Sequence, residues 1–489
     1  MDRNAILAVV LASIVLIVWT VFFAPPPPEF EAIPVDSTAT AQQLPELDEP
    51  DAVAERPAAG VEEVPTQSFN DSTFALAQIG TAEAVTVETD LYQAVFSTKG
   101  GTLTSFILKE YDTFGHERPV QIVDTTGAGA LSLVFTSLDS RLVDTRALYF
   151  EPSARGPVLA DDAERELTFT RALGSGALRY TYTFTPGSYE VGMRVEADGA
   201  ASFMATDGYE FIWNGGVPFA EGGAKEEAMV SGAYVRSGGE VESVNLTSDP
   251  VESYRLGGSI EWIAVKNSFF TAVVLPSSDV GTRGAELEGE RIGEDTDPNF
   301  WETYEARILV NRPAGDADTY RMYLGPVDYK QFSEYGVNLY DIVDYGFGSF
   351  VTRPIAKWIV MPSFNFLSSF IPNYGFVIII FAILIKLILF PLTKSSYRSM
   401  AKMRTLQPKM AEIKEKYKND PQKQQQATMK MYQESGVNPL GSCLPQLLQL
   451  PILFALFRFF PTSIDIRQEG FLWAQDLSAP DVVLNLPFS

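Results

Sequence analysis

A lysine interrupts the most apolar stretch in the second half of the chain. Lys386 lies within residues 374–390, where thirteen residues are Ile, Leu, Val or Phe. A cation at the centre of a membrane helix costs roughly 2.5–3.5 kcal/mol to insert, and each such apolar neighbour offsets roughly 0.3–0.6 kcal/mol of that cost. The helix should therefore insert. The lysine then either snorkels toward the membrane surface or, as we favour, faces a water-filled cavity.

Three polar residues in a later apolar run have the spacing of one helix face. Ser442, Gln446 and Gln449 are separated by four and three residues. Such side chains either hydrogen-bond between membrane helices or form the polar wall of a cavity shared with Lys386. Neither apolar run contains an acidic residue. Lys386 is therefore expected to meet water or a transient ligand instead of an intramembrane counter-ion.

The remaining residues offer little reaction chemistry. The chain has one histidine, His116, which we interpret as an ordinary loop residue, and one cysteine, Cys443. These counts exclude an intramolecular disulfide and any zinc site that needs several histidines or cysteines. We predict no enzyme activity, no catalytic residue, no metal and no cofactor.

The amino-terminal part predicts an anchor and a tether. Residues 5–24 are almost wholly apolar and end in bulky side chains, so 1–24 is expected to be an uncleaved transmembrane anchor. A long signal peptide cut after Ala24 is the alternative. Residues 25–69 begin with four prolines and continue rich in Pro, Ala and acidic residues, which predicts a disordered acidic linker.

The next 260 or so residues predict an all-β domain spanning 70–330. Short runs alternate polar with β-branched or aromatic residues and are bounded by Gly, Asp and Pro. Gly100-Gly101 joins two of these runs as a tight turn. Together they predict one large antiparallel sandwich. Representative runs are 83–89, 91–97, 102–109, 177–186, 189–197, 261–267 and 269–276.

The final third of the chain is expected to be helical and associated with the membrane. Residues 337–372 are apolar but interrupted by Pro354 and Pro362, which predicts an amphipathic helix lying in the interface. A transmembrane helix over 373–393 is closed by Pro391. A second transmembrane helix covers 438–461, and 462–489 forms a periplasmic segment after it.

Residues 394–436 have a helical period with a break at Asn419-Asp420-Pro421, which predicts a helical hairpin. Its methionines are expected to pack within the hairpin, with soft contact to apolar nascent segments as the alternative. The residues concerned are Met403, Met410, Met429 and Met431.

Charge divides the chain and sets its topology. The net charge is −25, yet 394–435 holds ten Lys/Arg against four Asp/Glu, whereas 25–373 holds 23 against 53. Basic short loops remain in the cytoplasm, so the hairpin and the amino terminus are expected there and the acidic β-domain outside, in the periplasm. The acidity also argues against nucleic-acid binding by that domain.

The carboxyl-terminal motifs resemble the YidC/Oxa/Alb family of membrane protein insertases. FPLTK (390–394), SMAKMRTLQPKM (399–410), VNPLGSC (437–443) and LPQLLQLPILFAL (444–456) are similar to the core signatures of that family, and DIRQEGFLWAQDLS (465–478) to the stretch after its third helix. The β-domain resembles, more weakly, the periplasmic β-supersandwich of the Gram-negative type. The resemblance implies an inner-membrane location and a fold with a membrane α-helical core plus an all-β periplasmic domain.

The resemblance also implies a function without bond chemistry. A hydrophilic groove, open to cytoplasm and lipid, would receive nascent membrane proteins, with the Sec translocon and the ribosome as further candidate partners beside the lipid bilayer. Lys386 falls on the position of the groove cation, where many members carry arginine, and Gln449 on a polar groove position. The family core has five membrane helices after the β-domain and this sequence offers two, so we expect it to be C-terminally truncated.

Two rival functions remain open at this level. A small-solute channel or transporter would be expected to show internal repeats and intramembrane carboxylates, and neither is evident. An anchored carbohydrate-binding β-domain is the other alternative, and the absence of an evident carboxylate pair argues against sugar-modifying catalysis.

Overall fold

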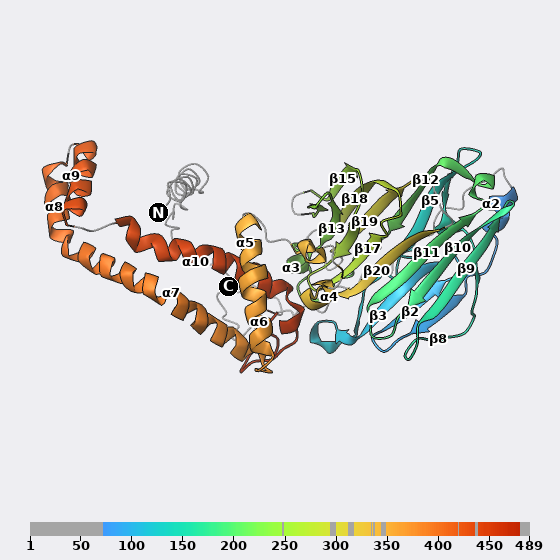
Figure 1. Ribbon diagram of the computed structural model, residues 1–489, viewed down its shortest axis with the longest axis horizontal. Helices are drawn as coiled ribbons and strands as arrows, with labels where there is room; N and C mark the ends of the chain where they lie inside the picture. Colours follow the sequence, from blue (N-terminus) through green and yellow to red (C-terminus); the bar gives the residue numbers. More distant parts are fainter. Residues whose placement is uncertain are drawn as a thin grey trace, which may run out of the picture. The chain divides into compact units, whose positions relative to one another are not determined.

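The computed structural model describes residues 72–479 apart from a few short gaps (Figure 1). The predicted anchor at 1–24, the predicted linker at 25–69 and residues 480–489 lie outside the described residues. The internal gaps are 247–248, 294–299, 312–316, 334, 336–337, 344–348, 419 and 436–438.

The described part of the β-domain contains twenty strands in three sheets. The sheet orders are β4-β3-β2-β1-β8, β14-β13-β16-β17-β20-β11-β10-β9-β7 and β15-β18-β19-β12-β5-β6. Among these described strands, β1 and β8 form the one parallel pair. The strands are β1 Ala84–Glu88, β2 Tyr92–Ser97, β3 Thr102–Asp112, β4 Pro119–Gln121, β5 Leu131–Ser137, β6 Leu142–Asp144, β7 Glu151–Pro152, β8 Val158–Leu159, β9 Arg165–Leu173, β10 Gly176–Phe184, β11 Glu190–Asp198, β12 Met204–Trp213, β13 Gly232–Ser237, β14 Glu240–Val244, β15 Val251–Gly257, β16 Trp262–Lys266, β17 Phe270–Pro276, β18 Thr282–Ile292, β19 Trp301–Val310 and β20 Asp318–Pro326.

Period-2 patterning in the sequence explains why these segments are strands. In β19 every second side chain is buried, so one face packs on the core while the other remains accessible. Gly100 and Gly101 both have positive φ and join β2 to β3, as the Gly-Gly pair predicted. The fold class is confirmed, but the predicted single sandwich consists of three sheets.

A buried hydroxyl network joins two of the sheets. Tyr209 of β12 donates to the carboxylate of Asp318 in β20 at 2.7 Å, and its hydroxyl lies 2.6 Å from that of Tyr320. All three side chains are buried. A buried polar group without a hydrogen-bond partner destabilises the folded state. The network therefore favours the one packing of the two sheets in which all three groups are paired.

Helices follow the last strand, and two short α-helices and three three-residue turns precede it among the described residues. Residues 349–368 form one continuous helical stretch, which lies within the range 337–372 where an amphipathic helix was predicted. A wider π turn, η5, follows Pro354, and Pro362 is the second residue of α6, directly after that turn. The helices are α2 Ser72–Ala77, α3 Ala224–Ala228, α4 Tyr329–Ser333, η4 Leu339–Ile342, α5 Ser349–Ile355, η5 Ala356–Val360, α6 Met361–Ser368, α7 Tyr374–Thr405, α8 Gln407–Lys416, α9 Pro421–Glu434, α10 Pro439–Phe459, η6 Phe460–Thr462 and η7 Ile464–Ile466, with three-residue turns η1 Phe114–His116, η2 Thr145–Ala147 and η3 Ala200–Ser202.

Candidate functional site

Lys386 lies on α7, whose first part is long and apolar enough to cross a membrane. Residues 374–391 meet that criterion, and among the described residues no other helix does. Asn373 caps the helix by accepting a hydrogen bond from the Gly375 N–H at 3.0 Å. Lys386 follows twelve residues after Tyr374, or about 18 Å along the axis. Its side chain is exposed, with no carboxylate of the described residues within ion-pair distance.

The helix does not end at Pro391, where a stop was predicted. α7 continues to Thr405, so the membrane segment and the first part of the expected hairpin form one rod (Figure 1). Proline removes one backbone hydrogen bond, which a long helix with strong helix formers on both sides tolerates. The Thr393 hydroxyl bonds back to the Leu389 carbonyl at 2.9 Å, a contact that often accompanies bent helices.

The predicted polar stripe lies on α10. The backbone of Ser442, Gln446 and Gln449 is helical, so their spacing of four and three residues places them on one side of α10. The side chains of Ser442 and Gln446 are outside the described residues, and the Gln449 side chain is exposed. Among the described side chains no hydrogen bond joins Lys386 to Gln449. The groove that would unite them thus stays a prediction.

An aromatic cluster around Phe364 packs α6, α7 and α10 together. The Phe364 ring lies 4.9 Å from that of Phe381, 5.4 Å from Phe459 and 5.6 Å from Phe460, measured between centroids. Phe364, Phe381 and Phe459 are buried. These contacts involve the first turns of α7 and the last turns of α10. They fix those two helix ends beside each other.

The hairpin methionines differ in their surroundings. Met410 of α8 accepts a hydrogen bond at its sulfur from the Tyr432 hydroxyl of α9 at 3.2 Å, and Met431 is buried. Met429 is exposed and Met403 is half-buried. Met410 therefore joins α8 to α9, which lie side by side in Figure 1, whereas Met429 is available to another molecule.

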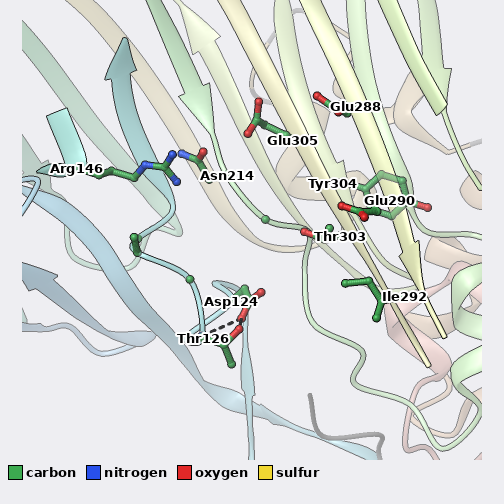
Figure 2. Close-up of a pocket in the computed structure, with 14 residues that line it drawn as sticks. Asp124, Thr126, Arg146, Asn214, Glu288, Glu290, Ile292, Thr303, Tyr304 and Glu305 are labelled. Atoms are coloured by element: carbon green, nitrogen blue, oxygen red, sulfur yellow. Dashed lines mark hydrogen bonds between the residues drawn. The ribbon is translucent and has the colours of Figure 1, made fainter. Parts of the chain in front are cut away.

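A polar pocket of about 500 Å³ lies within the β-domain (Figure 2). Arg146 and Asn214 point toward each other there, and Arg146 forms an ion pair with Asp144 at 2.7 Å. Strands β18 and β19 supply most of the carboxylates. The lining includes Asp124, Thr126, Arg146, Asn214, Glu288, Glu290, Ile292, Thr303, Tyr304 and Glu305.

Two of the pocket carboxylates oppose each other directly. Glu288 of β18 is the register partner of Glu305 in β19, and like charges in that arrangement repel. Arg307 forms ion pairs with both, at 3.9 Å to Glu288. Burial raises the pKa of Glu305, and Arg307 opposes that shift. The pocket is therefore acidic, and Arg307 pairs with two of the carboxylates that line it.

Sequence reasoning missed this pocket. The signal available was the alternation Glu286, Glu288, Glu290, which places three acids on one face of a strand. Without the register of β18 and β19, that pattern cannot be distinguished from an ordinary solvated face. Among the described residues, no group of His, Cys, Asp and Glu side chains is arranged to hold a metal ion.

Comparison with known proteins places both parts of the chain. A model of the YidC periplasmic domain matches residues 84–358, and a model described as 60Kd inner membrane protein matches 366–489. Solved structures match part of this chain at low similarity. A galactose mutarotase related enzyme from Lactobacillus acidophilus is 11% identical with a TM-score of 0.28, covering 49% of this chain and 97% of its own. Such a score supports no functional argument.

Relatives match the sequence from end to end. Membrane protein insertase YidC of Chlorobaculum parvum is 37% identical, over 100% of this chain and 81% of its own. The protein of the same name from Prosthecochloris aestuarii is also 37% identical, over 100% of this chain and 82% of its own. These relatives are named as insertases, which are not enzymes. The chain therefore belongs to the YidC family of membrane protein insertases and carries the periplasmic domain of that family.

Proposed function

We propose that this insertase receives nascent membrane proteins in a hydrophilic intramembrane groove and releases them to lipid, also acting as their chaperone. The observation that carries the proposal is the exposed Lys386 within the described apolar span at 374–391, twelve residues after its start. A charge held there without a carboxylate partner is unfavourable in lipid, and water or a passing polar segment relieves that cost. Gln449, Gln446 and Ser442 would supply the opposite wall.

In this account the groove lowers a barrier and makes no bond. A polar flank of a substrate crosses a shorter apolar distance, and its acidic groups are attracted transiently by Lys386. The ammonium is a point charge without the planar fork of arginine, which suits brief contacts with carboxylates in many orientations. Apolar segments of the substrate then leave sideways to lipid. The Sec translocon is a partner for some substrates, and others use the insertase alone.

The proposed topology places the basic hairpin in the cytoplasm and the β-domain in the periplasm. The hairpin carries more cations than acids, and the described ion pairs within it, Lys423–Asp420 and Lys430–Glu434, leave most of its lysines and arginines unpaired. Exposed basic side chains and the accessible Met429 suit contact with a ribosome or an emerging apolar segment.

The pocket of Figure 2 supports a second candidate function, binding of a carbohydrate by the β-domain. Its amide, phenol, guanidinium and carboxylate groups can hydrogen-bond to a ligand rich in hydroxyls. A glycan screen with the full-length protein tests this function. Binding that Asn214→Ala abolishes would support it, and no binding to any glycan would contradict it.

Complementation of an insertase-depleted strain tests the main proposal. Lys386→Arg should restore growth, because the charge is kept. Lys386→Leu should fail for substrates with acidic flanks. Lys394→Leu, eight residues further along α7, is the matched control and should behave as wild type. Full activity of Lys386→Leu on every substrate would refute the role of the charge.

A further inference from the structure

The segment after α10 folds on itself. We call residues 463–478 the strap. Asp476 Oδ1 accepts hydrogen bonds from the Gln468 N–H at 3.0 Å and the Ser478 N–H at 2.8 Å, and the Leu477 N–H donates to the Glu469 carbonyl at 3.0 Å. These bonds close the strap into an ordered loop.

Arg467, the fifth residue of the strap, attaches it to the β-domain. Its Nε lies 2.7 Å from Glu221 Oε1, and its Nη2 donates to the Asp112 carbonyl at 2.5 Å. The guanidinium also lies over the rings of Phe269 and Phe270, at 5.6 and 5.1 Å from their centroids. The Arg467 side chain is only 1% exposed.

The neighbouring Gln468 adds two bonds to the same edge of the β-domain. Its Nε2 donates to the carbonyls of Asp112 and Thr113 at 3.0 and 3.1 Å. A buried arginine is tolerated only where its charge and its N–H donors are satisfied. Removing either Arg467 or one of its partners should therefore destabilise the attachment, because a buried polar group would be left unpaired. Arg467 is therefore the main point of attachment between the strap and the β-domain.

Residues on both sides of Arg467 and Gln468 attach the strap to the start of α7. Asp465 accepts a hydrogen bond from the Tyr374 hydroxyl at 3.2 Å, and Asn373 Nδ2 donates to the Gly470 carbonyl at 3.1 Å. The Phe471 ring packs edge-on against Phe376, and it lies so close to Gly375 that a Cβ there would be 2.2 Å from Phe471 Cγ. Only glycine permits this approach.

We propose that the strap fixes the β-domain to the outer end of α7, with Arg467 as the positioning residue. The strap contacts both bodies with directional bonds, and the chain between β20 and α7 supplies only one further ion-pair bridge that is described, through Asp341 to Arg236 and Arg353. The strap thereby determines the position of the β-domain relative to α7, the helix on which Lys386 lies. This attachment goes beyond the insertase function itself.

Distance measurements on the full-length protein in lipid nanodiscs test the proposal. Spin labels at Leu138→Cys in the β-domain and Tyr397→Cys on α7, in a Cys443→Ser background, report how firmly the two are joined; both native side chains are exposed. Wild type should give a narrow distance distribution. Arg467→Ala should broaden it, and amide exchange in 463–478 should accelerate about tenfold or more.

The matched control is Arg291→Ala. Arg291 also forms an ion pair, with Glu302 at 2.7 Å, and also lies over an aromatic ring, that of Phe300, but both partners belong to the β-domain. This variant should leave the interdomain distance distribution narrow. Equal broadening in both variants would show a general loss of β-domain stability and would overturn the assignment to the strap.

A second variant acts on the contact between the strap and α7, and it keeps the test decisive if Arg467→Ala folds poorly. Gly375→Ala raises the helix propensity of α7 but forces Phe471 away. Gly375→Ala changes no residue of the β-domain. A broader interdomain distance distribution in this variant would therefore show that the strap joins the two parts. Unchanged distributions in Gly375→Ala, together with unchanged exchange in 463–478, would refute the proposal.

Discussion

Arg467 and Glu221 form a 2.7 Å ion pair although 246 residues separate them in the chain. Glu221 belongs to the loop between β12 and α3, and Arg467 to the strap beyond the last described long helix. Burial raises the pKa of Glu221, and the guanidinium of Arg467 counteracts this shift. The protonation of Glu221 in the β-domain therefore depends on Arg467, which belongs to the strap.

The stability of the β-domain should fall as pH rises from about 4.5 to 8, because of Glu227. Burial and the nearby Glu221 raise the pKa of Glu227 from 4.5 to about 8, whereas two backbone N–H groups and Arg467 oppose the shift. Within this window the folded state holds a proton that the unfolded chain has lost, so unfolding releases it. Each pH unit then removes up to about 1.4 kcal/mol of stability.

Urea unfolding followed at pH 6 and pH 8 measures this dependence. Glu227→Gln should flatten it, because the amide oxygen can still accept the N–H groups of Ala220 and Glu221 at 2.9 Å. The exposed neighbour Glu226 provides the control Glu226→Gln, which should retain the wild-type slope. An unchanged slope in Glu227→Gln would mean that another group titrates.

Tyr209→Phe should destabilise the β-domain by about 1–3 kcal/mol, because it leaves the buried Asp318 without its hydroxyl donor. The loss should appear as a lower urea midpoint. Tyr254→Phe on β15 is a control, since no hydrogen bond of the Tyr254 hydroxyl is described. Equal midpoints for Tyr209→Phe and wild type would show that the network contributes no net stability.

Phe364→Ala should loosen the contact of α6 with α7 and α10, because it removes the ring shared by Phe381, Phe459 and Phe460. Truncating a buried phenylalanine costs about 3–5 kcal/mol in a packed core. Amide exchange in α6 and the end of α10 is the measurement. Phe366→Ala, at a side chain 65% exposed, should change little. Equal exchange in the two variants would refute the packing role of Phe364.

Periodicity and composition predicted the fold class, since local alternation determines which segments become strands. The outcome at Pro391 differed because a proline rule describes one missing hydrogen bond, whereas the surrounding apolar and basic helix formers determine whether the helix continues. In the run at 337–372, where a helix was predicted, a π turn follows Pro354 and the described residues 349–368 are helical throughout.

The strap and the pocket could not be predicted from sequence. Arg467, Glu221 and Asp112 meet through contacts between distant parts of the chain, and no spacing pattern relates them. Glu288 and Glu305 become neighbours only through the register of β18 and β19. By contrast, Lys386 could be identified from the sequence, because it is a single cation among neighbouring apolar residues.

Site-specific crosslinking tests the central claim most directly. Photoreactive residues at positions 386 and 449, in the full-length protein, would be presented with ribosome-stalled nascent membrane proteins. The account predicts adducts from both positions. Position 416 on α8, whose side chain is exposed, is the control, and it should give no adduct with a substrate whose polar flank is already across the membrane. The absence of any adduct at 386 and at 449, with an insertion-competent protein, would contradict the groove.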